Sequence, residues 1–137
     1  TTPPDAKTTT SPYGNFEYTV NIPYLASACG AVYVARWTVL HIKRLTRAIK
    51  EAILKPGFSV VEVIAPCSTL YARKNRLGTG TDLLHFYHDN CEIQHGADLQ
   101  SSQIGFQDKI ICGKFLDIDK PTFRERLEKR REEVLAK

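Results

Sequence analysis

Several features that would direct an interpretation are missing from this sequence. It has no methionine among its 137 residues, so we expect Thr1 either to follow a removed initiator or to be an internal position of a processed or truncated chain. No apolar run approaches the roughly 20 residues that a membrane-spanning helix needs. Residues 1–5 lack the basic and apolar regions of a signal peptide. These absences favour a cytoplasmic protein with no membrane partner.

Cysteine pairs and strong charge are also missing. The four cysteines are Cys29, Cys67, Cys91 and Cys112, and no two of them form a Cys-x-x-Cys pair. Because nothing indicates secretion, we expect reduced thiols. The net charge of +4 is too small to indicate a nucleic-acid partner without a clustered basic patch. With 42% hydrophobic and 25% charged residues, the composition is typical of one globular domain.

The first half has the pattern of two β-strands joined by an α-helix. Residues 32–36 and 59–64 are β-branched runs that predict buried strands. Residues 39–54 carry apolar side chains at helical spacing, namely Ile42, Leu45, Ile49 and Ile53. Thr38 is the predicted N-cap of this helix, and Pro56 with Gly57 ends it. The spacing predicts parallel strands with a right-handed crossover helix, and therefore an α/β fold.

The other segments are predicted from caps, turns and composition. Residues 1–20 and 96–108 are expected to be loops. The predicted helices and strand are a short helix from Ile22 to about Cys29 after the N-cap Asn21, a helix begun by Thr81 and Asp82, a C-terminal strand over 109–118, and a charged helix from Pro121.

Cys67 is the candidate site residue that its position favours most. It lies just past the end of the predicted strand 59–64, and ligands of open α/β sheets bind at the carboxyl ends of the strands. The basic residues Arg73, Lys74 and Arg76 follow it and would favour a thiolate. The alternative is a cysteine that packs as a small apolar side chain. Cys29 and Cys112 are expected to pack in this way, Cys29 on an apolar helix and Cys112 in an apolar strand.

Two alternatives of another class remain open. His85, His88, Cys91 and His95 would share one face of a continuous helix, which is a common arrangement of metal ligands. The chain would then be a stand-alone metal-binding module that uses the His85/His88/Cys91 face. The basic side of the 39–54 helix would suit an acidic partner in a stand-alone binding module.

Five stretches of the sequence together resemble one family. They are TTP at 1–3 with SPYGN at 11–15, GAVYVARWT at 30–38, GFSVVEV at 57–63 leading to PCST at 66–69, RKNR at 73–76, and KIICGK with DIDKPTF between 109 and 123. This set is similar to the β subunit of 2-oxoacid:ferredoxin oxidoreductases, and the likeness is strongest to the 2-oxoglutarate synthase branch. It extends over essentially the whole chain.

The resemblance implies an activity, cofactors and partners. The activity would be coenzyme A-dependent oxidative decarboxylation of a 2-oxoacid, with electrons leaving through a 4Fe–4S cluster. The cofactors would be thiamine diphosphate, Mg²⁺ and that cluster, and the protein partners an α subunit and ferredoxin. Residues 1–80 would be the C-terminal half of the thiamine diphosphate-binding domain, and residues 81–137 a C-terminal extension.

The sequence also departs from the family pattern. The family's Cys-x-x-Cys pair, its third cluster cysteine and its Gly-Asp-Gly motif are absent, while its fourth cluster cysteine matches Cys67. The resemblance therefore makes Cys67 the expected metal ligand. We expect the isolated chain to be inactive and to bind neither thiamine diphosphate nor Mg²⁺ tightly. His85, His88, Cys91 and His95 match no motif of the family.

Overall fold

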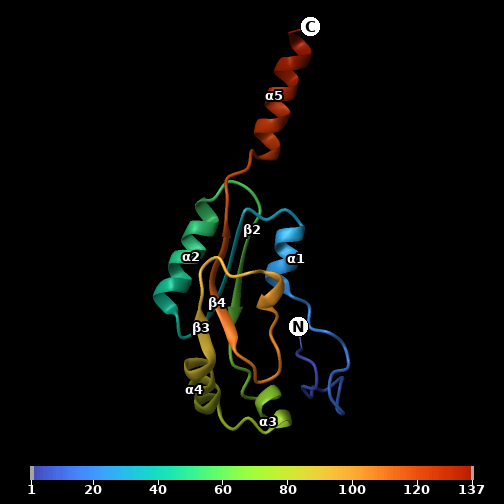
Figure 1. Cartoon of the computed structure of the whole chain (residues 1–137), viewed down its shortest axis with the longest axis vertical. Coiled ribbons are helices and arrows are strands. Elements are labelled where there is room, and N and C mark those ends of the chain that lie inside the picture. The colour runs from blue at the N-terminus through green and yellow to red at the C-terminus, as the bar shows by residue number, and fades with distance from the viewer. Residues whose placement is uncertain (1, 137) are drawn as a thin grey trace.

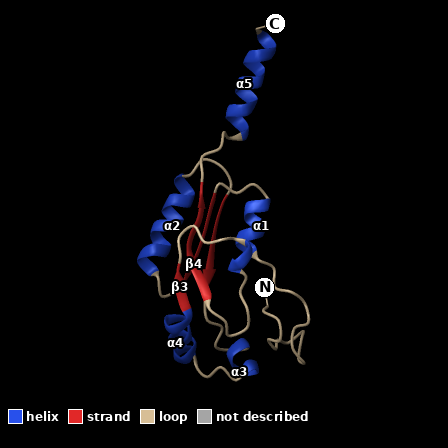
Figure 2. Cartoon of the chain, in the orientation of Figure 1, coloured by secondary structure: helices blue, strands red, loops and turns tan. Residues whose placement is uncertain are grey.

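The computed structural model describes residues 2–136, which form a mixed four-stranded sheet with helices around it (Figures 1 and 2). The strands are β1 (Tyr33–Thr38), β2 (Ser59–Ile64), β3 (Cys91–Ile93) and β4 (Ile110–Asp117). The helices are α1 (Ile22–Ala28), α2 (Ile42–Leu54), α3 (Tyr71–Asn75), α4 (Gly80–Asn90), the 3₁₀-helix η1 (Gln100–Ser102) and α5 (Phe123–Leu135).

The predicted parallel strand pair is confirmed. β1 pairs with β2 in parallel from Tyr33 opposite Ser59 to Thr38 opposite Ile64, and α2 connects them. β4 pairs with the other side of β1 in the antiparallel direction, and β3 pairs in parallel with β4. The strand order is β2-β1-β4-β3. β2 is therefore an edge strand and only partly buried, so the prediction of a buried strand over 59–64 was wrong in that respect.

The core has two halves, one on each face of the sheet. Every residue of β1 is buried, and successive side chains of a strand point to opposite faces. Tyr33 and Trp37 pack with α2 on one face, whereas Val34 packs with Phe115 and Ala26 of α1 on the other. Figure 1 shows α2 and α1 on the two sides of the sheet. This arrangement confirms the α/β fold.

α2 differs from its prediction at the N-terminus and in its buried face. It begins at Ile42, and Thr38 belongs to β1 and does not cap it. The residues that face the core are Leu45, Ala48 and Ala52, while Ile42, Ile49 and Ile53 are exposed. The alanines face the core because their small side chains let the helix lie close to the large side chains of β1, which turns the isoleucines outward.

The other helices show how local capping decides where an element begins. Asn21 accepts the N–H of Tyr24 and caps α1, as predicted. α4 begins two residues earlier than expected, because Thr79 rather than Thr81 is the N-cap and forms a capping box with Asp82. α5 extends away from the sheet (Figure 1) and buries no residue. None of the helices in residues 2–136 is both long and apolar enough to cross a membrane.

Candidate functional site

Cys67 lies at the carboxyl end of the parallel strand pair, as the sequence predicts. It follows β2 by three residues and precedes the turn that leads into α3. Its side chain is exposed. The backbone N–H groups of Tyr71 and Leu70 donate to its sulfur, and together with the Thr69 hydroxyl they lower the pKa of the thiol. These hydrogen bonds favour the thiolate form of an exposed cysteine.

The cause of the lowered pKa differs from the prediction. The basic side chains of Arg73, Lys74 and Arg76 follow Cys67 in the sequence, but the groups that stabilise its thiolate are the hydrogen-bond donors of residues 69–71, where α3 begins. Arg73 and Lys74 lie in the last turn of α3, and Arg76 is its left-handed C-cap.

A largely apolar cavity of about 470 Å³ lies beside Cys67. Aromatic side chains from α3 and α4 line it, namely Tyr71, Phe86 and Tyr87. The pKa of Tyr87 is raised, first by burial and then by the charge of the Cys67 thiolate. Asp108 and Gln107 from the loop before β4 add polar groups to the lining.

The N-terminal segment closes one side of this region. Pro3 lines the same cavity. The Asn75 side chain accepts the N–H of Lys7 at 2.7 Å and donates to the carbonyl of Lys7 at 2.9 Å, so one residue of α3 holds the segment in both directions. The loop predicted for residues 1–20 is confirmed over residues 2–20, with Thr1 outside the described residues, and it borders the Cys67 cavity.

The predicted metal-binding face on one helix was wrong. α4 ends at Asn90, and Cys91 is the first residue of β3. His85 and His88 are exposed on α4. His95 lies beyond β3, where its ring meets Trp37 edge-on with 5.9 Å between the ring centroids. The four side chains do not converge, because the change from helix to strand at Cys91 breaks the helical spacing.

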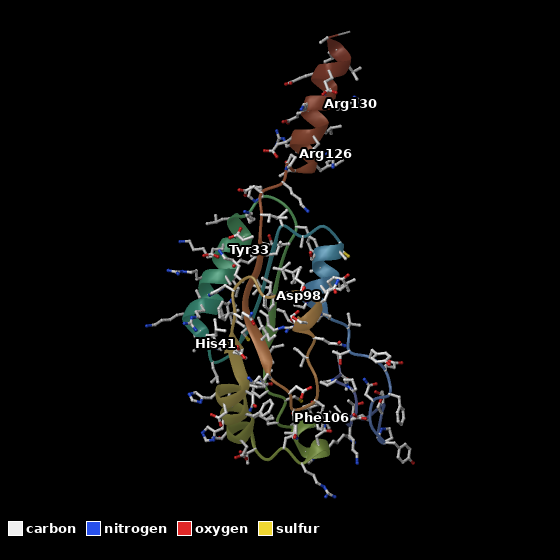
Figure 3. All side chains as sticks on the ribbon, in the orientation of Figure 1. Tyr33, His41, Asp98, Phe106, Arg126 and Arg130 are labelled. Atoms are coloured by element: carbon white, nitrogen blue, oxygen red, sulfur yellow. The ribbon has the colours of Figure 1, made fainter. Side chains whose placement is uncertain are left out.

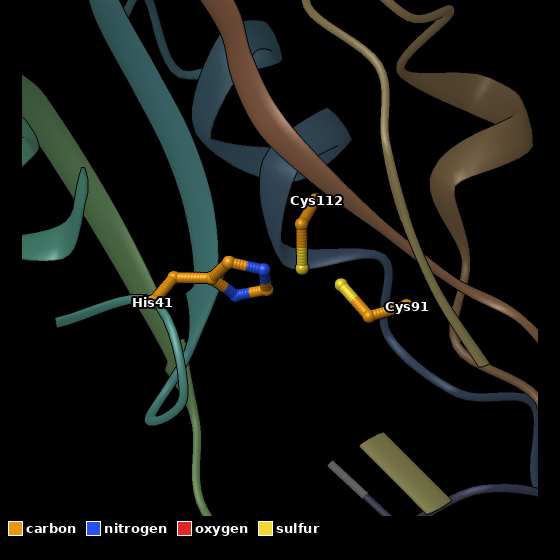
Figure 4. Close-up of side chains that lie close together, drawn as sticks. All are labelled: His41, Cys91 and Cys112. Carbon is orange, nitrogen blue, oxygen red and sulfur yellow. The ribbon is translucent and has the colours of Figure 1, made fainter. Parts of the chain in front are cut away.

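The structure instead gathers His41, Cys91 and Cys112, a set that the sequence analysis missed. One ligand atom of each lies within 4.8 Å of the other two (Figure 4). The three residues come from the turn before α2, from β3 and from β4, so no spacing in the sequence indicates them. Cys112 is buried, as predicted, but Cys29 is exposed, and its predicted core packing was wrong.

Comparisons with known proteins show the same resemblance. Residues 1–63 match the family of thiamine pyrophosphate enzymes, C-terminal TPP binding domain. The chain is 42% identical over 130 residues to 2-oxoglutarate synthase subunit KorB of Methanocaldococcus jannaschii. The aligned region covers 94% of this chain and 47% of that subunit. The same subunit of Archaeoglobus fulgidus is 40% identical over 120 residues, or 85% of this chain and 43% of that subunit.

A solved structure agrees with these relatives. The fold matches a chain of the 2-oxoglutarate:ferredoxin oxidoreductase from Magnetococcus marinus, solved with 2-oxoglutarate, coenzyme A and succinyl-CoA bound. The TM-score is 0.73 at 25% sequence identity, over 96% of this chain and 45% of that one. The chain thus spans about half the length of the relatives it matches. In sequence and fold, it is homologous to the 2-oxoglutarate synthase subunit KorB, as its resemblance to that branch predicts.

Proposed function

We propose that this chain is part of the β subunit of a coenzyme A-dependent 2-oxoacid:ferredoxin oxidoreductase, with 2-oxoglutarate as the substrate. The observation that carries the proposal is the homology to KorB over 94% of the chain, together with the thiolate-stabilising turn at Cys67. When bound, thiamine diphosphate supplies the electron sink for decarboxylation, and an iron–sulfur cluster supplies the path for electrons.

Cys67 fits the role of one cluster ligand. A 4Fe–4S cluster is held by four cysteine thiolates, and Cys67 offers an exposed sulfur whose charged form is stabilised by backbone N–H groups. Hydrogen bonds to ligand sulfurs also tune the potential of such clusters. Within residues 2–136 Cys67 belongs to no group of three or more potential metal ligands. The remaining thiolates would have to come from outside this stretch of chain.

The described residues do not fit a Mg²⁺ site. Mg²⁺ prefers oxygen ligands, and among residues 2–136 the one cluster of potential metal ligands contains a histidine and two cysteines but no carboxylate. We therefore assign no residue of this chain to Mg²⁺ or to the diphosphate. The proposed role of the segment matched by the thiamine pyrophosphate family is to form one wall of the domain. The boundary at residue 80 between that domain and a C-terminal extension stays a prediction.

Exposed apolar side chains support contacts with an α subunit and with the remainder of the β subunit. Tyr13, Phe16 and Tyr18 are each at least 87% exposed, and the segment that carries them borders the Cys67 cavity through Pro3. A cluster of large exposed apolar groups is typical of a surface that another chain covers. We propose that the surface around Cys67, next to this segment, is where electrons leave for ferredoxin.

A chimera tests the proposal. The matching half of Methanocaldococcus jannaschii KorB would be replaced by this chain and assembled with the other subunits of that enzyme. We expect the chimera to reduce ferredoxin in a reaction that needs both 2-oxoglutarate and coenzyme A, and to prefer 2-oxoglutarate to pyruvate. A folded chimera that retains thiamine diphosphate and iron but reduces ferredoxin with no 2-oxoacid would contradict the proposed function.

A further inference from the structure

The face of the sheet that packs against α2 brings three soft ligands together. His41 lies in the turn between β1 and α2, Cys91 begins β3, and Cys112 is in β4. In the parallel pairing of β3 with β4, Cys91 is opposite Ile110 and Ile93 is opposite Cys112. The two cysteines are thus diagonal neighbours on one face, since side chains two residues apart along a strand point the same way. Figure 4 shows the His41 ring directed at both sulfurs.

Thr38 orients two of these three side chains. Its hydroxyl lies 2.9 Å from Nδ1 of His41 and also accepts the N–H of Leu40. Its backbone N–H hydrogen-bonds the sulfur of Cys112. Because Nδ1 of His41 is engaged, Nε2 is the atom left free for coordination. Metal-bound histidines usually hold their second ring nitrogen in such a hydrogen bond, which fixes the ring.

The surroundings also favour a ligand set over three unrelated core residues. Cys112 is fully buried in the core cluster on this face of the sheet, and Cys91 packs against that cluster. Trp37 covers the site, with its ring centroid 5.5 Å from that of His41. A purely apolar core would not need an imidazole that a contact with the Thr38 hydroxyl holds beside two thiols.

We propose that Nε2 of His41 and the sulfurs of Cys91 and Cys112 bind a zinc ion. One imidazole and two thiolates suit Zn²⁺ in tetrahedral coordination, and three protein ligands leave the fourth position to water or another group. Each thiol releases its proton when the metal binds. The ion would join β3 and β4 to the start of α2. None of the three residues lines the Cys67 cavity, so this site is separate from the proposed cluster ligand.

Metal titration of the purified, reduced chain tests the proposal. We expect one Zn²⁺ per chain, and we expect Co²⁺ in its place to give the visible and charge-transfer bands of a tetrahedral site with thiolate ligands. Zinc should also raise the melting temperature, because a ligand that binds only the folded state stabilises it. Failure to bind one equivalent of zinc after full reduction would overturn the proposal, as would a cobalt spectrum without sulfur ligands.

Variants locate the ion. Removal of an outer hydrogen-bond partner costs roughly 10–100-fold in metal affinity, so Thr38→Val should lose about that much zinc affinity. Cys91→Ser and His41→Gln remove ligands themselves and should lose more. Thr38→Val keeps the side-chain volume, so it also tests the site if the ligand variants fail to fold. Cys29→Ser should bind zinc like the parent chain. Unchanged affinity in all three site variants, or loss of zinc in Cys67→Ser instead, would overturn the assignment.

Discussion

Replacing Arg36 with methionine should destabilise the chain strongly. Arg36 is 1% exposed in the central strand, and its Nε lies 2.6 Å from Oε2 of Glu62 on the neighbouring strand. Its Nη1 donates to the carbonyl oxygens of Ser102 and Ile111. The guanidinium also lies over the ring of Phe115. One side chain thus joins β2, β4 and the η1 loop to β1.

The magnitude follows from what the methionine leaves behind. The Glu62 side chain is only 12% exposed, so it would remain a nearly buried carboxylate without its cation. Removing one partner of a buried ion pair typically costs about 3–5 kcal/mol, out of a total stability of about 5–15 kcal/mol for a domain. Changing Glu62 to methionine as well removes the unpaired charge, so the double variant should regain much of the loss.

Urea unfolding followed by circular dichroism would measure these differences. A matched control is Arg124→Met on α5, where the pair with Glu128 is exposed, and the expected loss is only about 0.3–0.5 kcal/mol. If Arg36→Met cost no more than this control, the account of the central strand would be refuted. A double variant less stable than Arg36→Met alone would refute the argument from the unpaired carboxylate.

Three further changes test other parts of the structure. Because hydrogen bonds lower its pKa, the Cys67 thiol should be alkylated with a midpoint below pH ~8.5, and mass spectrometry should show the midpoint rising in urea; equal midpoints would contradict this. Gly57→Ala should cost about 1–3 kcal/mol on thermal melting, because φ is +120° and the new Cβ would lie 2.9 Å from a valine methyl; Gly30→Ala, with open space at φ +87°, should cost less. Asn75→Ala should speed hydrogen exchange in the N-terminal segment, since both bonds to Lys7 are lost; unchanged exchange would contradict that anchor.

The crossover unit could be predicted from the sequence because its signals are local. The β-branched run of β2 is bounded by Gly57 and Pro66, and its predicted limits coincide with the observed ones. The face that α2 buries could not be predicted by counting apolar residues. Whether Ala48 or Ile49 faces the sheet depends on how close the helix axis lies to Trp37, which is a property of the packed structure.

The position of Cys67 was predictable and that of the zinc ligands was not. Cys67 lies just past the end of a strong strand, so the strand places it at the edge where ligands bind. Cys91 and Cys112 meet only because β3 pairs in parallel with β4, and β3 is three residues long. A short strand after a helix leaves no clear pattern in the sequence. The helical spacing from His85 to Cys91 therefore indicated the wrong partners for Cys91.

The iron content of a Cys67→Ser variant, measured within the KorB chimera, tests the central claim most directly. Cys29→Ser is the matched control, because both cysteines are exposed and only Cys67 receives the hydrogen bonds of the α3 turn. We expect the Cys67 variant to lose cluster iron and the paramagnetic resonance signal of the reduced cluster, because serine is a harder ligand than a thiolate, and we expect the Cys29 variant to keep both. A Cys67→Ser chimera with full iron and an unchanged signal would contradict the assignment of Cys67 as a cluster ligand.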